Sequence, residues 1–430
     1  MDMVSQLEAM VQEQYHGEDG TEELTSTLVR AGFRRLLEEM LEAEVSEYLG
    51  REPYERSPDA LVGYRNGYKE RRIDTAEGRV PVRVPQVRDT EDPYRSRLWQ
   101  AMRKRTEILE RLVVEMYVRG LSTRDVEDTL KGLGEGLDDG QSLLSRSSVS
   151  RATEVLWEEY EAFSERDLSG FNVVYSFCDG VYESLRQQAN MDEAVLVTWG
   201  ILQDGRKVLI HMSLGNKESE EDWLEHLRDM VRRGLPTPLT VTTDGAAGLI
   251  KAVEAMWPES ERIRCWMHKM GNVLDKVPDT VRPELKAYLQ DIRDAPSHGA
   301  GERRLQRLID RYEPQYPSAI KSLKNDAAAS LAHLKLPRRH QKNIRTTNLV
   351  ERSFEEERRR AKVLPRFRTE RECLKLVFGV LWRASERWQR VTFSEHEQRQ
   401  LQAYKDLRKQ EREAKRQRNN PPKEDDHVAS

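Results

Sequence analysis

Between residues 171 and 267, short apolar runs alternate with amphipathic segments, and this alternation constrains the possible fold most strongly. The pattern predicts strands at 172–177, 194–202, 207–214 and 239–243, and a weaker strand at 262–267. It predicts amphipathic helices at 218–233 and 246–256. Strands interspersed with helices in this way are typical of an α/β domain.

The flanking regions have a different character. Helices are predicted at 21–49, at 107–130 with a break after Gly120, and at 147–164. Between 61 and 88, valines alternate with Pro81, Arg83 and Pro85, which predicts a hairpin at a sheet edge. Residues 272–335 are predicted to be almost wholly helical, with helix boundaries at Pro278, Pro283, Pro296 and Pro314. Further helices are expected at 348–362 and 370–388, and a charged helical extension from 396, followed by a disordered end.

Charge is unevenly distributed. The whole chain carries a formal charge of −4, which excludes a uniformly cationic, histone-like binder. Residues 1–60 hold 15 acidic and 5 basic residues, whereas residues 335–371 hold 13 basic and 5 acidic residues, and 399–418 hold 8 basic and 3 acidic residues. These basic segments are either solvated helix faces or surfaces that bind phosphate groups.

The compartment is predicted from what the sequence lacks. Its apolar runs are too short or too charged to span a membrane, and the N-terminus has no secretory signal pattern. Three cysteines cannot form a disulfide framework in a chain of 430 residues. We therefore expect a cytoplasmic protein without a membrane partner.

Two predicted strands are each followed by an Asp-Gly pair, at Asp179 and Asp244. Asp-Gly is common in ordinary turns, so either pair alone is weak evidence for a site. In an α/β sheet, however, functional residues collect at the carboxyl ends of strands. If the two strands are neighbours, the aspartates lie about 5 Å apart, and like charges at that distance favour a hard cation such as Mg²⁺ or Mn²⁺.

A third carboxylate, Glu351, lies in the predicted helix at 348–362. With Asn348 as the N-cap, Glu351 fits the position of a capping-box glutamate. The same helix is rich in arginine, however, and a carboxylate among cations also suits a metal site that faces a DNA backbone. The sequence of this helix leaves both interpretations open.

Cys265 and His268 form a Cys-x-x-His pair, which supplies half of a structural zinc site. No second Cys/His pair with ligand spacing occurs in the sequence, so zinc is not expected. We favour a structural or DNA-contacting role for this pair. The nearby Trp257 and Trp266 are expected in the core, with stacking on an unpaired base as the alternative for an insertion-domain tryptophan.

Taken in order, four motifs resemble the Mutator-like transposases of bacterial insertion sequences. They are Asp-Gly-Val-Tyr at 179–182, TTDGAAGL at 242–249, RCWMHKMGNVL at 264–274 and TTNLVERSFEEERRR at 346–360. Upstream, GYRNGYKERRIDTAEGRVPVRVPQVRD at 63–89 and MYVRGLSTRDVEDTL at 116–130 are similar to the same family. The resemblance covers roughly residues 50–390.

The resemblance implies a ribonuclease-H-like catalytic domain with a DDE triad, which falls on Asp179, Asp244 and Glu351. These residues would hold two Mg²⁺ or Mn²⁺ ions, which would clamp the attacking and leaving oxygens of an in-line phosphoryl transfer. Water attacks first and releases a 3′-OH at the element end, and that 3′-OH then attacks target DNA. The helices at 272–335 would be an insertion between the second aspartate and the glutamate.

The partners expected from the resemblance and the charge pattern are the terminal inverted repeats of the element, target DNA and a second copy of the chain in a homodimer. Helices 121–131 and 147–163 resemble a helix-turn-helix pair, although the connection between them is unusually long. The expected location is the bacterial cytoplasm, in association with the nucleoid. The candidate DNA-binding residues are Arg65, Asn66, Lys69, Arg71, Arg72, Ser148, Ser150, Arg151, Cys265, His268, Lys269, Lys342, Arg345, Asn348, Arg352, Arg358 and Arg359.

These expectations define a multidomain α/β protein. The segments are an acidic helical region (1–60), a basic hairpin (61–98), a helix-turn-helix-like DNA-binding domain (99–168), the first part of the catalytic domain (169–268), a helical insertion (269–340), the last part of the catalytic domain (341–395) and a basic tail (396–430). Two alternative functions remain open at this stage, a catalytically silent DNA-binding protein of the same fold and a nuclease that cuts without joining.

Overall fold

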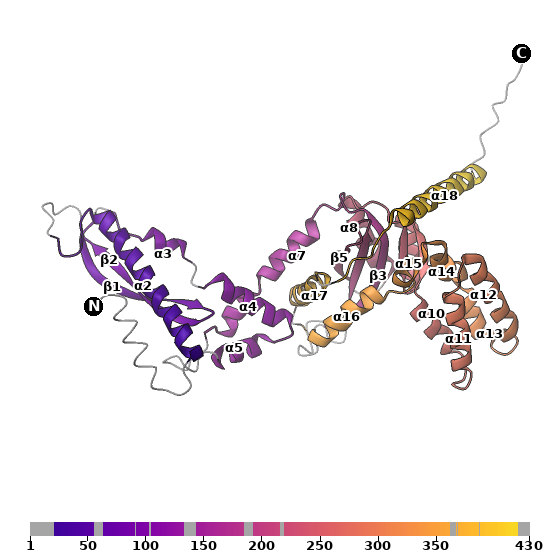
Figure 1. Cartoon of the computed structure of the whole chain (residues 1–430), viewed down its shortest axis with the longest axis horizontal. Coiled ribbons are helices and arrows are strands. Elements are labelled where there is room, and N and C mark those ends of the chain that lie inside the picture. Colours follow the sequence, from indigo (N-terminus) through magenta and orange to yellow (C-terminus); the bar gives the residue numbers. More distant parts are fainter. Residues whose placement is uncertain are drawn as a thin grey trace, which may run out of the picture. The chain divides into compact units, whose positions relative to one another are not determined.

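The computed structural model divides into two compact units, Met1–Glu154 and Val155–Ser430, each with its own core (Figure 1). It describes residues 21–55, 63–90, 92–102, 105–132, 143–184, 192–215, 219–361, 367, 369–386 and 388–419. Of the disordered end predicted at 419–430, Asn419 is the last residue of a helix, and residues 420–430 lie outside these ranges.

The first unit begins with helix α2 (Thr21–Leu49), which packs on a two-stranded antiparallel sheet, β1 (Tyr64–Thr75) and β2 (Gly78–Arg88). Short helix α3 (Arg97–Ala101) follows. The predicted hairpin is confirmed, and Val80, Val82 and Val84 of β2 are buried, whereas Pro81 and Arg83 between them are exposed. Asn66-Gly67 is not a turn but an irregularity within β1, where the pairing register shifts and Gly67 has a φ of 70°.

Three helices complete this unit, α4 (Glu107–Val118), α5 (Thr123–Gly132) and α6 (Arg146–Ala152), and their apolar faces form one core. The single helix predicted at 147–164 is wrong, because α6 ends and α7 (Val155–Glu165) begins after a turn at 153–154. The Thr153 hydroxyl donates to the Ser150 carbonyl, a local bond that competes with the regular helix pattern. Most of the long connection between α5 and α6 lies outside the described residues.

The second unit is built on a five-stranded mixed sheet in the order β5-β4-β3-β6-β7, which confirms the α/β prediction. The strands are β3 (Val173–Ser184), β4 (Asp192–Leu202), β5 (Lys207–Gly215), β6 (Thr240–Thr243) and β7 (Glu261–Arg264). The pairs β3–β4 and β4–β5 are antiparallel, and β3–β6 and β6–β7 are parallel. The carboxyl ends of β3, β6 and β7 therefore point in the same direction.

Helices cover both faces of this sheet. On one face, α8 (Glu220–Arg232) and α9 (Ala247–Met256) pack on Leu196, Ile210 and Val241. On the other face, Trp199 of β4 packs at a tilt of 41° against Trp388, which follows the helix Glu370–Ser385, with 4.3 Å between ring centroids. This buried, two-sided sheet makes a rigid base for side chains at its edge.

A helical segment separates β7 from the later helices and gathers beside the sheet (Figure 1). It comprises α10 (Trp266–Leu274), α11 (Arg282–Arg293), α12 (His298–Tyr312), α13 (Pro317–Lys324), α14 (Ala327–Leu331), the 3₁₀ helix η2 (Ala332–Lys335) and α15 (Arg338–Ile344). Trp266 is fully buried in its core and donates its indole N–H to the Ser330 carbonyl at 2.7 Å, and Trp257 is buried in the sheet core. The predicted core positions of both tryptophans and the helical nature of this segment are confirmed.

Three helices complete the described chain, α16 (Asn348–Ala361), α17 (Glu370–Ser385) and α18 (Glu395–Asn419). Phe378 of α17 packs against Phe163 of α7, with ring centroids 5.1 Å apart. None of the helices in the described ranges is long and apolar enough to cross a membrane.

Two histidines are buried together between β5 and α8, with ring centroids 4.4 Å apart. His226 contacts the hydroxyls of Thr198 and Ser213 at 2.9 Å and 2.6 Å, and Arg233 contacts His211 at 2.9 Å. Because an arginine only donates, the contacted His211 nitrogen accepts and that ring is neutral. Burial lowers the pKa of His226 to about 3, and it also lowers the pKa of His211.

We expect this unit to lose stability in acid because of these histidines. The unfolded chain takes up a proton on His226 below about pH 6.5, whereas the folded chain does not, so stability falls as the pH drops below that value. Between pH 7 and pH 5, the free energy of unfolding falls by about 2 kcal/mol for one histidine that stays neutral in the folded protein. Urea unfolding of the wild type and of His226→Gln at both pH values measures it. An equal pH dependence of the two proteins would contradict the assignment.

Candidate active site

The two aspartates singled out in the sequence lie side by side on neighbouring parallel strands. β3 and β6 are paired through Cys178 and Thr243, and Asp179 and Asp244 are the next residues on each strand. Asp179 is 8% exposed, and Asp244 is half-buried. The structure therefore confirms that the two strands are neighbours and that both aspartates lie at the same edge.

The prediction that β3 ends before Asp179 is wrong. The strand continues to Ser184 because it stays paired with β4, with Asp179 opposite Val197 and Gly180 opposite Leu196. Only the parallel partner β6 ends at this level. The Asp179 carboxylate, which accepts the Gly180 N–H at 3.0 Å, is thus placed by a continuous strand rather than by a turn.

Asp244 has a different backbone setting. Gly245 adopts a φ of 94°, a conformation that favours glycine, and the Asp244 carboxylate accepts the Ala246 N–H at 2.9 Å. A Cβ on Gly245 would lie 2.2 Å from the guanidinium carbon of the buried Arg264. Arg264 therefore packs against the turn that carries Asp244.

The start and the end of the helical segment meet at this edge of the sheet. The Trp266 N–H donates to the Arg345 carbonyl at 2.9 Å, and the Thr242 hydroxyl donates to the Ile344 carbonyl at 2.8 Å. The Thr347 N–H points to the Cys265 sulfur at 3.4 Å. These contacts place the first turn of α16 next to the ends of β6 and β7. The strand predicted at 262–267 is too long, because β7 ends at Arg264 and α10 begins at Trp266.

Glu351 projects from the first turns of α16 and is not a capping-box glutamate. The Thr347 carbonyl accepts the Val350 and Glu351 N–H groups at 2.8 Å and 2.9 Å, so Thr347, not Asn348, is the N-cap residue. Glu351 therefore lies one position beyond the capping-box site. Its Oε1 instead accepts the hydroxyl of the buried Thr347 at 2.8 Å.

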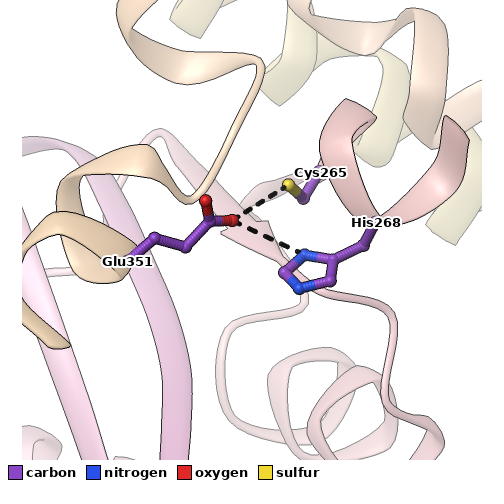
Figure 2. Close-up of side chains that lie close together, drawn as sticks. All are labelled: Cys265, His268 and Glu351. Carbon is purple, nitrogen blue, oxygen red and sulfur yellow. Dashed lines mark hydrogen bonds and ion pairs between the residues drawn. The ribbon is translucent and has the colours of Figure 1, made fainter. Parts of the chain in front are cut away.

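Cys265, His268 and Glu351 form one cluster, as Figure 2 shows. The Cys265 sulfur lies 4.0 Å and His268 Nδ1 lies 3.8 Å from Glu351 Oε1. The interaction with Cys265 raises the pKa of His268 to about 9 against the opposing effect of burial. Burial alone would raise the pKa of Cys265, but its contacts with His268 and Thr347 outweigh burial and lower it. Each of the two groups therefore favours the charged form of the other.

The same histidine connects this cluster to the aspartates. The charges of Asp179 and Glu351 both contribute to the raised pKa of His268, after the larger effect of Cys265. The charges of Asp179 and Asp244 both contribute to raising the pKa of Cys178 to about 12, although its burial is the largest cause. Asp179 on β3 and Asp244 directly after β6 are neighbours through the pairing of these strands, and the contact of Glu351 with Cys265, which directly follows β7, brings the third carboxylate to the same end of the sheet. Such oxygen donors suit a hard divalent cation.

The candidate DNA-binding residues near this edge are in different environments. Lys342, Asn348, Arg352 and Arg358 are exposed, and Arg359 is exposed and pairs with Glu356. Arg345 pairs with Asp294. Lys269 is 3% exposed, and its ammonium donates to the Ser322 and Asn325 carbonyls, a structural role within the helical segment.

In the first unit, the candidates lie on β1 and α6. Exposed side chains on these two elements are Asn66, Lys69, Arg71, Arg72, Ser150 and Arg151, and Ser148 is half-buried. Arg65 is also half-buried, and its guanidinium donates to the Ser46 hydroxyl at 2.8 Å.

Sequence reasoning missed Thr347 and Arg264 as parts of the site. Thr347 contacts both Glu351 and Cys265, and Arg264 supports the turn of Asp244. The sequence indicated these residues only by their position, because Arg264 lies in the motif at 264–274 and Thr347 lies in the motif at 346–360. Their partners, however, are apparent only once the strands and α16 are brought together.

Comparison with known proteins places the chain among related sequences. Residues 3–391 match the model of a family described as "Transposase, Mutator family". The transposase for insertion sequence element ISRM5 of Rhizobium meliloti is 33% identical over 365 residues, which cover 84% of this chain and 88% of the relative. The transposase for IS406 of Burkholderia multivorans is 32% identical, with coverage of 83% and 90%. The transposase for IS256 in transposon Tn4001 of Staphylococcus aureus is 27% identical, with coverage of 81% and 88%.

Proposed function

Because the chain belongs to the Mutator family of transposases, we propose that Asp179, Asp244 and Glu351 form the active site with which it cuts element ends and joins them to target DNA. Membership makes the chain a DNA transposase of an insertion sequence. The observation that supports the assignment of residues is the pairing of β3 with β6 beside Asp179 and Asp244, together with the contact of Glu351 with Cys265, which directly follows β7.

The proposed catalytic domain is ribonuclease-H-like. Three antiparallel strands followed by two parallel ones, in the order β5-β4-β3-β6-β7, support this proposal. The helical segment α10–α15 would then be the insertion between the second aspartate and the glutamate. The division of the chain into the seven segments given above remains part of the proposal.

The donor set fits Mg²⁺ or Mn²⁺. Asp179, Asp244 and Glu351 offer carboxylate oxygens only, which these hard ions prefer, and they would hold two ions between them. When bound, the ions would stabilise the charge on the attacking and leaving oxygens of the phosphoryl transfer.

The chain's own contribution is to hold these carboxylates in place. Asp179 is fixed by the continuous strand β3, Asp244 by its bond to the Ala246 N–H, and Glu351 by the Thr347 hydroxyl. The proposed nucleophile of the first reaction is water, which leaves a 3′-OH at the element end, and that 3′-OH attacks target DNA in the second. Neither reaction needs a covalent protein–DNA intermediate.

The proposed DNA contacts extend over both units. The exposed cations of β1 and the residues at the start of α6 would bind terminal inverted repeats, with α5 and α6 as a helix-turn-helix-like element. The exposed Lys342, Arg352 and Arg358 would contact the backbone of the DNA being cut. A homodimer associated with the nucleoid would bring two ends together.

Purified protein incubated with its own element ends and Mg²⁺ or Mn²⁺ tests this proposal. We expect nicks at the element ends and joined products in target DNA, and neither product with random duplex ends. Nicks without joined products would favour the alternative of a nuclease that only cuts. Specific binding without any cleavage would favour the catalytically silent alternative.

Thr347 provides a test of how Glu351 is positioned. Thr347→Val keeps the shape but removes the hydroxyl that holds Glu351, so we expect cleavage to fall by about 10-fold or more, a typical loss for a residue that supports a metal ligand. Thr347→Ser keeps the hydroxyl and should recover most of the rate. Cleavage rates at saturating DNA measure the effect, and equal rates for the valine and serine variants would contradict it.

A further inference from the structure

Cys265, His268 and Glu351 together have the composition of a transition-metal site. One ligand atom from each residue lies within 4.8 Å of the other two (Figure 2). Cys265 directly follows β7, His268 is in the first turn of α10, and Glu351 comes from α16. The sequence supplied only the Cys-x-x-His half of a site, and the fold adds the glutamate as a third ligand.

The distances are close to those of a coordinated ion. Zinc bonds of about 2.0–2.3 Å in tetrahedral geometry hold ligand atoms about 3.3–3.5 Å apart. The sulfur and Nδ1 lie 4.0 Å and 3.8 Å from Glu351 Oε1, so each contact needs to close by about 0.5 Å. Nδ1 is buried from solvent, and its distance to the carboxylate is longer than a hydrogen bond.

The cluster also has a path to solvent. The side chains of His268 and Glu351 are 42% and 28% exposed, whereas Cys265 is buried beneath them. An ion can therefore enter from the exposed side and keep one position for water, as in zinc sites with three protein ligands. Binding would release the remaining protons of the thiol and the imidazole to solvent.

The donor types select the ion. A thiolate and an imidazole favour Zn²⁺ and similar borderline ions, whereas Mg²⁺ prefers oxygen ligands. Glu351 belongs both to this cluster and to the proposed catalytic carboxylates. An ion held by Cys265 and His268 would therefore compete for Glu351, and excess Mg²⁺ would not displace it from the sulfur.

We propose that Cys265, His268 and Glu351 form an inhibitory site for Zn²⁺ or a similar transition-metal ion, which draws Glu351 away from Asp179 and Asp244. The inhibition, but not the metal binding, depends on the catalytic role of Glu351 proposed above. The site makes transposition sensitive to the free zinc concentration.

Titration of the full chain with Co²⁺, in the absence of DNA and of thiol reductants, tests the binding. We expect one equivalent of Co²⁺ to give a thiolate-to-cobalt charge-transfer absorption that Zn²⁺ removes. Cys265→Ser should abolish this absorption, and His268→Asn and Glu351→Gln should weaken binding by at least about 10-fold. The matched control is Cys373→Ala, which removes another buried cysteine and should leave the absorption unchanged. An absorption that is absent, or that persists in Cys265→Ser, would overturn the proposal.

Cleavage assays with the wild type test the inhibition separately. In the presence of Mg²⁺, Zn²⁺ at a concentration that saturates the spectroscopic site should reduce cleavage by at least about 10-fold, and a zinc chelator should restore it. Unchanged cleavage with the site saturated would overturn the inhibitory role. If Glu351→Gln cleaves normally, the proposed catalytic site fails, while the cobalt titration still decides whether the metal site exists.

Discussion

Glu351→Gln should leave the protein folded and able to bind element ends, and should reduce cleavage to below detection. Glutamine keeps the shape of the side chain, and its amide oxygen can still accept the Thr347 hydroxyl, so the start of α16 is preserved. The substitution removes only the negative charge that would bind a divalent cation. Several kcal/mol of transition-state stabilisation correspond to a rate loss on the order of 1,000-fold or more. Single-turnover cleavage of labelled element ends measures this loss.

Glu355→Gln is the matched control for this experiment. Glu355 lies one turn further along α16 but is exposed, whereas Glu356 pairs with arginines and Glu357 is buried. Glu355 is therefore the local carboxylate most able to replace Glu351, and we expect its substitution to leave substantial activity. If Glu355→Gln is inactive while Glu351→Gln cuts normally, the glutamate has been assigned wrongly. If both variants cut well, the triad itself is wrong.

Asp244→Asn and Asp179→Asn should each reduce the cleavage rate by a similar factor, on the order of 1,000-fold. Asparagine can still accept the Ala246 N–H at position 244 and the Gly180 N–H at position 179, so the backbone at both positions is retained. Asp204→Asn, at an exposed turn between β4 and β5, is the matched control and should cut normally. Gel-shift assays with element ends should show unchanged binding for all three variants.

Either aspartate variant that cuts at the wild-type rate would remove that residue from the site. A variant that loses both binding and cleavage would instead indicate damage to the fold, which thermal unfolding would reveal. The three measurements together separate chemistry, recognition and stability.

Local patterns predicted most of the architecture. The valines of β2, the apolar runs of β3 to β6 and the prolines of the helical segment each determine a local structure with little help from distant residues. They also located Asp179, Asp244 and Glu351 correctly relative to their elements, apart from the boundary of β3. The prediction that the two aspartates lie close together required their strands to be neighbours, and the structure shows that β3 and β6 are paired.

The remaining features depend on contacts that no local pattern contains. β3 continues past Asp179 because β4 pairs with it, although Asp-Gly is usually read as a turn. Thr347, the N-cap of α16, contacts Cys265, which lies far away in the sequence. Lys269 has the composition of a DNA contact, yet its ammonium is buried against two carbonyls from α13 and the residue that follows it.

The contact between Trp266 and Arg345 means that the helical segment between them leaves the sheet and returns to it at the same place. The two residues are joined by a backbone hydrogen bond, so everything from α10 to α15 begins and ends at one point of the sheet edge. Relatives can therefore carry larger or smaller segments here while Glu351 stays in register with the aspartates. For this architecture, we expect the size of the helical segment, rather than the proposed reaction, to set the spacing between Asp244 and Glu351.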